Sequence, residues 1–119
     1  MVVQPALEGC AHMARHRIVG INFDHQHMGD LLRMVIDHPD AEVVGVCHAD
    51  RSKLEPVVAR LGLDPALMHT DYRACIEQSR PTLAILCPAA SAHGEWVCKV
   101  APYGLDILVE KPFAASLRE

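Results

Sequence analysis

Residues 18–36 read IVGINFDHQHMGDLLRMVI, and they join a short apolar run to a stretch with helical spacing. The run at residues 18–21 is continuously apolar, which suits a strand buried on both faces of a parallel sheet. The helical stretch places one set of apolar side chains on a single face: Met28, Leu31, Leu32, Val35 and Ile36. The segment therefore predicts a strand that leads directly into a helix, as in the first half of a βαβ unit.

The rest of the chain repeats this alternation. Apolar runs at residues 43–47, 83–87 and 107–109 predict three more buried strands, and a weaker strand is expected at 67–69. Helical patterns lie between them at 50–61, 71–78 and 91–100. Either Asp50 or Ser52 is expected to cap the first of these helices, and Ser91 to open the last. The order predicts an α/β fold, a doubly wound parallel sheet with helices on both sides, whose ligands bind beyond the carboxyl ends of the strands.

The chain of 119 residues is long enough for one domain, which we expect at residues 17–119 after a disordered extension at 1–16. Half of the residues are apolar and 22% are charged, as in an ordinary globular protein. Acidic residues outnumber lysine and arginine by 15 to 11, so there is no basic excess to bind nucleic-acid phosphates. No apolar run approaches the length of a bilayer span, and the first residues do not read as a secretory signal. The sequence thus argues against nucleic-acid and membrane partners.

The five cysteines form no Cys-x-x-Cys pair, and Cys47 and Cys87 lie inside apolar runs. This pattern is typical of buried, reduced thiols in a cytoplasmic protein, which is the location we expect.

Two short motifs follow the fourth and fifth predicted strands. Pro88 and His93 form a Pro-x-x-x-x-His pattern, and Glu110-Lys111-Pro112 ends the last strand. In these motifs the sequence resembles the glucose–fructose oxidoreductase / inositol dehydrogenase / rhizopine catabolism (Gfo/Idh/MocA) family over about residues 17–119. The resemblance implies an NAD(P)-binding Rossmann fold. It also implies an oxidoreductase that moves a hydride between a hydroxyl carbon of a sugar, cyclitol or related compound and the nicotinamide of NAD or NADP.

The resemblance assigns roles to these motif residues. Lys111 would lie near the nicotinamide and the reacting oxygen, where its cation stabilises a developing alkoxide or passes a proton. Glu110 would steady Lys111, and the Lys111–Pro112 peptide is expected to be cis. His93 would start the fourth helix near the middle of the cofactor, or simply contact the backbone of a neighbouring loop. The alternative for Glu110 and Lys111 is a solvated pair that ends a strand.

The loop after the first strand departs from the family. A dinucleotide fold has Gly-x-Gly-x-x-Gly here, whereas residues 22–29 read NFDHQHMG. Asn22 can replace a glycine because asparagine tolerates a positive φ. Asp24 is a good N-cap for the following helix, and its carboxylate would then occupy the N–H groups that hold phosphate. It would also repel the phosphate by about 1 kcal/mol or more.

The loop after the second strand departs as well. The family usually has an acid there for the adenosine ribose hydroxyls, but this chain has His48. Arg51 and Lys53 follow, which slightly favours the 2′-phosphate of NADP over NAD. Alternatively, Asp50 takes the place of the acid or merely caps the helix. The residues expected to contact the cofactor are Asn22, Phe23, His25, His48, Arg51, Pro88, His93, Glu110 and Lys111, and those expected to act in the chemistry are Lys111 and Glu110.

The sequence also raises the possibility of a metal site, since Asp24, His25, His27 and Asp30 lie within seven positions. On a helix, however, His25 and His27 would point about 200° apart. We therefore expect no metal, although an unrelated, metal-linked doubly wound domain remains an alternative interpretation.

The second, α+β domain of the family is not found in this sequence. We therefore expect a truncated product or fragment that is inactive alone, with an exposed edge strand and an apolar surface that favour self-association. The principal alternative is a non-catalytic relative that has lost dinucleotide binding and serves as a binding or regulatory module.

Overall fold

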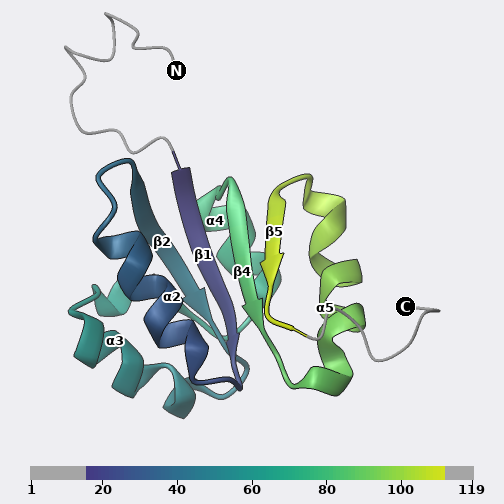
Figure 1. The fold of residues 1–119 in the computed structure, drawn as a ribbon, viewed down its shortest axis with the longest axis horizontal. Helices are drawn as coiled ribbons and strands as arrows, with labels where there is room; N and C mark the ends of the chain where they lie inside the picture. Colours follow the sequence, from purple (N-terminus) through teal and green to yellow (C-terminus); the bar gives the residue numbers. More distant parts are fainter. Residues whose placement is uncertain (1–15, 112–119) are drawn as a thin grey trace, which may run out of the picture.

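The computed structural model describes residues 16–111, and within them the chain alternates strands and helices as the sequence predicts (Figure 1). The strands are β1 (His16–Phe23), β2 (Ala41–Cys47), β3 (Met68–His69), β4 (Leu83–Cys87) and β5 (Asp106–Val109). The helices are α2 (His27–Ile36), α3 (Glu55–Leu61), α4 (Tyr72–Ser79) and α5 (His93–Val100). Short 3-10 turns lie at Arg51–Lys53, Pro65–Leu67, Ala90–Ala92 and Ala101–Tyr103. The α/β class is confirmed, whereas the extension expected at 1–16 lies outside the described residues except for His16, which begins β1.

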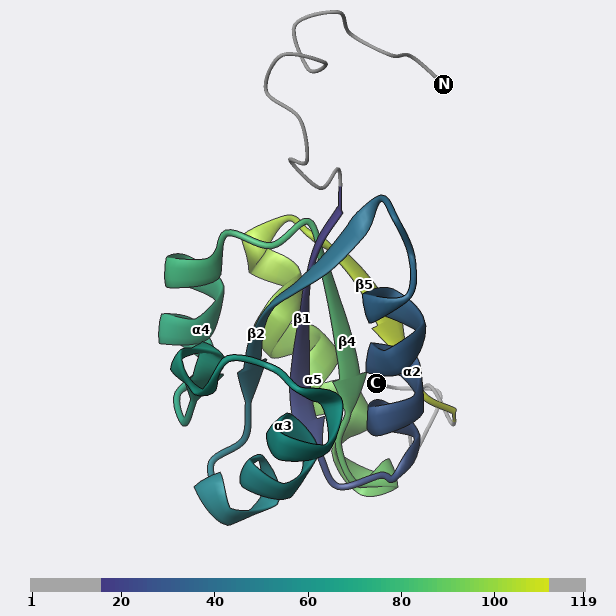
Figure 2. The same ribbon diagram turned by 90° about the vertical axis from the view of Figure 1, so that its left-hand side faces the viewer.

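The five strands form one parallel sheet in the order β3-β2-β1-β4-β5. The chain builds outward from β1 through β2 to β3, and then crosses to β4 on the other side of β1. Helices α2 and α3 cover one face of the sheet, and α4 and α5 cover the other (Figure 2). The direction of winding therefore reverses between β1 and β4, which is where doubly wound sheets bind ligands.

Two apolar clusters, one on each face, hold these layers together. Ile18 and Val43 pack with α2 and α3, whereas Val19 and Ile21 pack with α4 and α5. Successive residues of a strand point to opposite faces, so a strand covered on both faces is apolar at every position. Val19 and Ile21 are completely buried, and each such side chain contributes about 1.5–3 kcal/mol to folding.

The ends of the helices correct two of the expected caps. Asp50 caps the 3-10 turn at Arg51–Lys53 by accepting from the Ser52 N–H, and α3 begins only at Glu55, so neither Asp50 nor Ser52 caps α3 itself. Ser91 lies within the 3-10 turn that precedes α5, which begins at His93 without a side-chain cap. In both places a short tight turn takes up the residues that sequence assigned to the first helical turn. Among residues 16–111, no helix is both long and apolar enough to cross a membrane.

Candidate functional site

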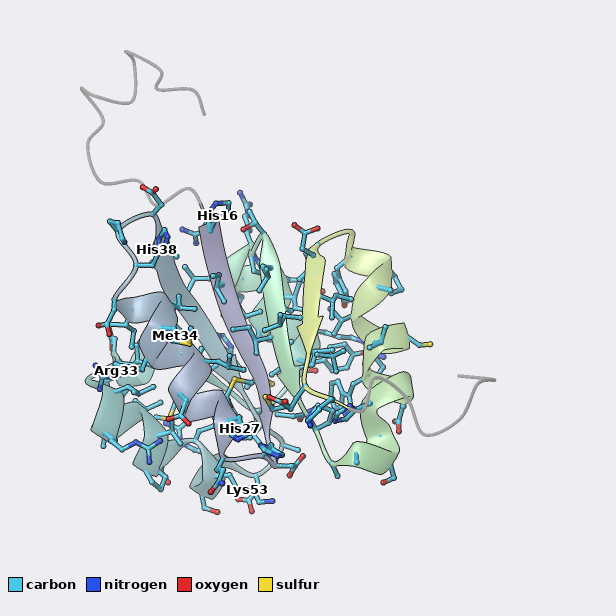
Figure 3. The ribbon with its side chains drawn as sticks, in the orientation of Figure 1. His16, His27, Arg33, Met34, His38 and Lys53 are labelled. Carbon is cyan, nitrogen blue, oxygen red and sulfur yellow. The ribbon has the colours of Figure 1, made fainter. Side chains whose placement is uncertain are left out.

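The loops that follow β1, β2, β4 and β5 meet at the carboxyl edge of the sheet. His27 and Lys53 lie at this edge in Figure 3, whereas His16 and His38 lie at the opposite one. Two backbone hydrogen bonds hold the loops in place, since the Asp24 N–H donates to the Cys87 carbonyl at 3.1 Å and the Glu110 N–H donates to the Leu86 carbonyl at 3.2 Å. The predicted site residues from these four loops therefore share one end of the molecule.

Asn22 ends the regular part of β1, and its φ of 69° confirms the left-handed conformation expected of it. The residue is only 5% exposed. Its side-chain Nδ2 is a buried donor without a hydrogen-bond partner among residues 16–111. Leaving a buried donor unpaired costs about 1–3 kcal/mol. An unpaired amide is therefore unusual at the edge of the sheet where a ligand would bind.

Asp24 does not cap α2, which corrects the sequence-based expectation. Gln26 is the N-cap and makes no side-chain capping bond. The Asp24 carboxylate turns instead toward the loop after β2, where its Oδ1 accepts from His48 Nε2 and from Lys53 Nζ, each at 3.1 Å. Two donors that are cationic or strongly polar outcompete the single backbone N–H that a capping position offers. At the start of α2 the His27 N–H donates instead to His25 Nδ1 at 3.2 Å, so a ring nitrogen rather than a carboxylate lies there.

The charge of Asp24 is fixed by these contacts. Burial alone would raise the pKa of its carboxyl, but the hydrogen bonds from His48 and Lys53 outweigh burial and hold that pKa below its ordinary value. The Asp50 N–H donates to His48 Nδ1 at 2.9 Å, so the ring proton belongs on Nε2, facing Asp24. His48 is itself buried. The result is an ionised carboxylate clamped between the first two strand ends.

Glu110 meets the loop after β1 at the other side of the site. His27 Nδ1 lies 3.2 Å from Glu110 Oε2, and this hydrogen bond is the main reason why the pKa of Glu110 is held below its ordinary value. His25 stacks obliquely on His27, with ring centroids 4.2 Å apart. Within the described part of the chain, the Glu110 carboxylate forms no ion pair with the exposed Lys111 ammonium. The expected cis peptide before Pro112 lies outside the described residues.

His93 is nearly completely buried, with an exposed fraction of 2%, at the first residue of α5. Its Nε2 lies 3.0 Å from the Pro88 carbonyl. A carbonyl only accepts, so Nε2 donates and fixes the loop after β4. The contact with a loop backbone that the sequence allowed for His93 is therefore present, and its place near the middle of the cofactor stays a prediction.

The structure therefore brings most of the predicted residues together and adds some that sequence reasoning missed. Arg51 is exposed and forms no ion pair with residues 16–111. The missed residues are Asp24 as a partner of His48, Lys53 as a partner of Asp24, and His27 as a partner of Glu110. The parallel order of the strands was the signal for these pairs, because neighbouring strands bring their loops to one edge. No cluster of three or more potential metal ligands occurs in the described part of the chain.

A doubly wound parallel sheet of strand order β3-β2-β1-β4-β5 is a Rossmann-type fold. The profile of the family described as "Oxidoreductase family, NAD-binding Rossmann fold" (Gfo/Idh/MocA) matches residues 14–119, and the chain belongs to this family.

Among curated proteins, the chain is 28% identical over 109 residues to scyllo-inositol 2-dehydrogenase (NAD(+)) of Bacillus subtilis. The aligned region covers 91% of this chain and 30% of that protein. The chain is 30% identical over 86 residues to glycosyl hydrolase family 109 protein 1 of Akkermansia muciniphila, covering 66% of this chain and 18% of that one. Each curated relative is thus matched over less than a third of its length.

Solved structures share the fold at lower identity. Myo-inositol dehydrogenase from Lactobacillus casei, in complex with NAD(H) and myo-inositol, superposes with a TM-score of 0.76 at 22% identity over 89% of this chain and 31% of that one. The WlbA dehydrogenase from Bordetella pertussis, in complex with NADH and UDP-GlcNAcA, superposes with a TM-score of 0.72 at 20% identity over 84% and 30%.

Proposed function

We propose that this chain is the dinucleotide-binding part of an oxidoreductase that transfers a hydride between NAD(P) and a hydroxyl carbon of a sugar, cyclitol or related polyol. Family membership supports the cofactor class, and the inositol dehydrogenase among its relatives supports the substrate class. The observation that carries the proposal is the position of the Asp24 carboxylate, which His48 and Lys53 hold away from the start of α2, so that no carboxylate but only the His25 ring accepts the His27 N–H there. A helix start of this kind can receive a pyrophosphate even though the loop lacks the usual glycines.

The residues present fit such a cofactor along the whole edge. Asn22, Phe23 and His25 would lie against the pyrophosphate, and His48 and Arg51 near the adenosine ribose. Pro88 and His93 would shape the middle of the site, with Glu110 and Lys111 at the nicotinamide end. The nicotinamide, when bound, supplies the hydride acceptor or donor. Lys111 would stabilise negative charge on the substrate oxygen or exchange its proton, while Glu110, fixed by His27, would set the position of the segment that carries Lys111.

The choice between NAD and NADP stays a prediction. Sequence slightly favours NADP because Arg51 and Lys53 could meet a 2′-phosphate. Arg51 keeps that capacity, but Lys53 is paired with Asp24 at 3.1 Å. The support for NADP therefore rests on Arg51.

We also propose that the 119-residue chain alone binds the dinucleotide without turning over a polyol. The reason is that it matches less than a third of the length of each dehydrogenase to which it is similar. A cytoplasmic location remains our expectation and agrees with the free thiols of Cys47, Cys75, Cys87 and Cys98.

Calorimetric titration with NADH and NADPH tests the binding proposal. Saturable binding of either nucleotide is expected, together with no polyol-dependent NADH formation from NAD and myo-inositol. Absence of binding to both nucleotides would refute the proposal, and protein-dependent turnover would refute the inactivity of the chain alone.

A second candidate is a non-catalytic relative that does not bind dinucleotides. It is favoured by one specific observation, the His27–Glu110 hydrogen bond of 3.2 Å that joins the loop after β1 to the end of β5. If this bond keeps the nucleotide out, His27→Ala should create or strengthen NADH binding in the same titration.

We further propose that the chain self-associates. An apolar hollow of about 460 Å³ lies between α2 and the β4–β5 side of the sheet, and Leu31, Leu83, Ile85 and Leu108 contribute to its lining. Leu108 on β5 is 46% exposed and Met34 on α2 is 68% exposed, which is unusual for large apolar side chains.

A further inference from the structure

The carboxylate of Asp24 lies where the loops after β1 and β2 meet. It comes from the β1 side, yet it contacts His48 and Lys53, which both follow β2. Figure 3 places Lys53 at the same edge of the molecule as His27, the first residue of α2. Asp24 thus lies between the start of α2 and the loop after β2.

This position matters because of what a dinucleotide needs there. In Rossmann folds the pyrophosphate lies at the first helix, and an acid after the second strand accepts hydrogen bonds from the adenosine ribose. This chain has His48 at the place of that acid, so sequence suggests that the ribose acceptor is missing. The structure supplies a carboxylate to the same place from the neighbouring loop, 3.1 Å from His48 Nε2.

The Asp24 carboxylate also has an oxygen that could accept a further hydrogen bond. Both of its hydrogen bonds use Oδ1, and Oδ2 makes no hydrogen bond with residues 16–111. The side chain is 28% exposed, so it is held in place and still accessible. His48 and Lys53 keep it ionised, as the lowered pKa of Asp24 indicates. An ionised oxygen of this kind accepts hydrogen bonds from hydroxyl groups and repels a phosphate dianion.

We propose that Asp24 is the acceptor for the adenosine ribose hydroxyls, positioned by His48 and Lys53, and that it selects NAD(H) over NADP(H). The inference rests on the proposed dinucleotide binding and reverses the slight preference for NADP that sequence suggested. Lys53 belongs to this arrangement as the partner of Asp24 rather than as a free cation for a 2′-phosphate.

Asp50 is the competing carboxylate, because it lies in the same loop as Lys53. Its Oδ1 accepts from the Ser52 N–H at 3.0 Å and from the Ser52 hydroxyl at 2.6 Å, which orients the carboxylate to cap the 3-10 turn. Asp50 also lacks the link to β1 that places Asp24 beside the start of α2. The Asp50→Asn variant removes the same charge as Asp24→Asn, but from the loop after β2, and therefore tests the alternative directly.

The experiment is calorimetric titration of NADH and NADPH into the 119-residue chain and its Asp24→Asn, Asp24→Ser, Asp50→Asn and Asp37→Asn variants. Asp37 lies at the far end of α2 and serves as a charge control. The unchanged chain should bind NADH about tenfold or more tightly than NADPH. Both Asp24 variants should weaken NADH binding about tenfold, because a hydrogen bond to a charged group is lost, and should narrow the preference over NADPH. Both control variants should stay within about twofold.

Three results would overturn the inference. They are a preference of the unchanged chain for NADPH, an Asp24→Asn variant that binds NADH as tightly or more tightly, and a loss of NADH binding in Asp50→Asn. Tighter binding by Asp24→Asn would show that the carboxylate repels the pyrophosphate. Circular dichroism of both Asp24 variants shows that they fold, and the serine keeps a hydrogen-bonding group without the charge. If the unchanged chain binds neither nucleotide, the proposed function itself fails, which is a distinct outcome.

Discussion

His27 Nδ1 lies 3.2 Å from Glu110 Oε2, so the first residue of α2 is joined to the residue that follows β5. Strand β4 lies between β1 and β5 in the sheet, and the hydrogen bond reaches across its end. This hydrogen bond therefore connects two segments: the loop that stands in place of the usual glycine motif, and the Glu110-Lys111 segment after β5. A substitution in one segment should therefore change the environment of the other.

The first prediction concerns the titration of Glu110. His27→Ala should raise the pKa of Glu110 toward its ordinary value of 4.5, because the hydrogen bond from His27 is the main cause of its lowering. A carboxyl whose pKa is lowered by folding adds stability above its unfolded pKa, and this contribution is lost as the pH falls through the folded value. Carbon-13 NMR of the glutamate carboxyls measures the shift directly. His16→Ala, at the opposite edge of the sheet, should leave Glu110 unchanged, and equal pKa values in the two variants would contradict the assignment.

The second prediction concerns the close approach of α4 to β2 at Gly45. A Cβ at this position would lie 2.6 Å from Ser79 Oγ and 3.0 Å from Cys75 Sγ. Gly45→Ala should therefore destabilise the fold by about 1–3 kcal/mol, as measured by urea unfolding. Adding Ser79→Ala should recover part of that loss, since the nearest atom is removed.

Gly62→Ala is the matched control for Gly45. Gly62 has a φ of 70°, and no neighbouring atom lies within 4 Å of the position that a Cβ would take, so alanine there strains the backbone without a packing clash. It should cost about 1 kcal/mol, and Ser79→Ala should not restore it. Equal rescue in both backgrounds would show that Ser79→Ala stabilises the protein for a reason unrelated to Gly45.

The fold could be predicted from the sequence because its signals are local. The apolar run at residues 18–21 and the helical face of Met28 and Leu32 lie within one βα unit. The burial of each segment can be inferred from the pattern of its own residues. The left-handed conformation of Asn22 is also a property of one residue and its neighbours, and it is confirmed by the φ of 69°.

The contacts of the site could not be predicted in the same way. His27 and Glu110 are 83 positions apart, and Asp24 and His48 are 24 apart, so both pairs depend on which strand ends become neighbours. The N-cap expected at Asp24 was wrong for this reason. The local pattern offered one backbone N–H, whereas the fold offered His48 and Lys53, which lie beyond any local window.

The third prediction concerns thiol reactivity. Burial raises the pKa of Cys87 to about 11, and the hydrogen bond with Cys75 together with burial raises that of Cys47. Only a thiolate attacks a disulfide reagent, so Cys47 and Cys87 should react slowly at pH 8. The hydrogen bond with Cys47 lowers the pKa of Cys75, but its side chain is completely buried, so Cys75 should react slowly because the reagent does not reach it. Cys98 is exposed. In a Cys10→Ser background, Ellman's reagent should therefore modify one thiol quickly and the remainder only in urea.

The outcome in the absence of Cys98 checks this assignment. Cys98→Ser in the same background should abolish the fast phase and leave the slow one. A fast phase that survives would mean that Cys47, Cys75 or Cys87 becomes accessible through local opening of the sheet.

The fourth prediction concerns the apolar hollow between α2 and the β4–β5 side of the sheet. Sedimentation velocity should show an average sedimentation coefficient that rises with concentration, because Leu108 lies 46% exposed on an edge strand with no neighbour beyond it in the sheet formed by residues 16–111. Leu108→Lys should abolish the rise, since association would bury an unpaired ammonium. Ala59→Lys offers a control at an exposed position of α3, outside the lining of the hollow, and should leave association intact. A single sedimentation coefficient for the unchanged chain at all concentrations would mean that this apolar surface does not bring two copies together.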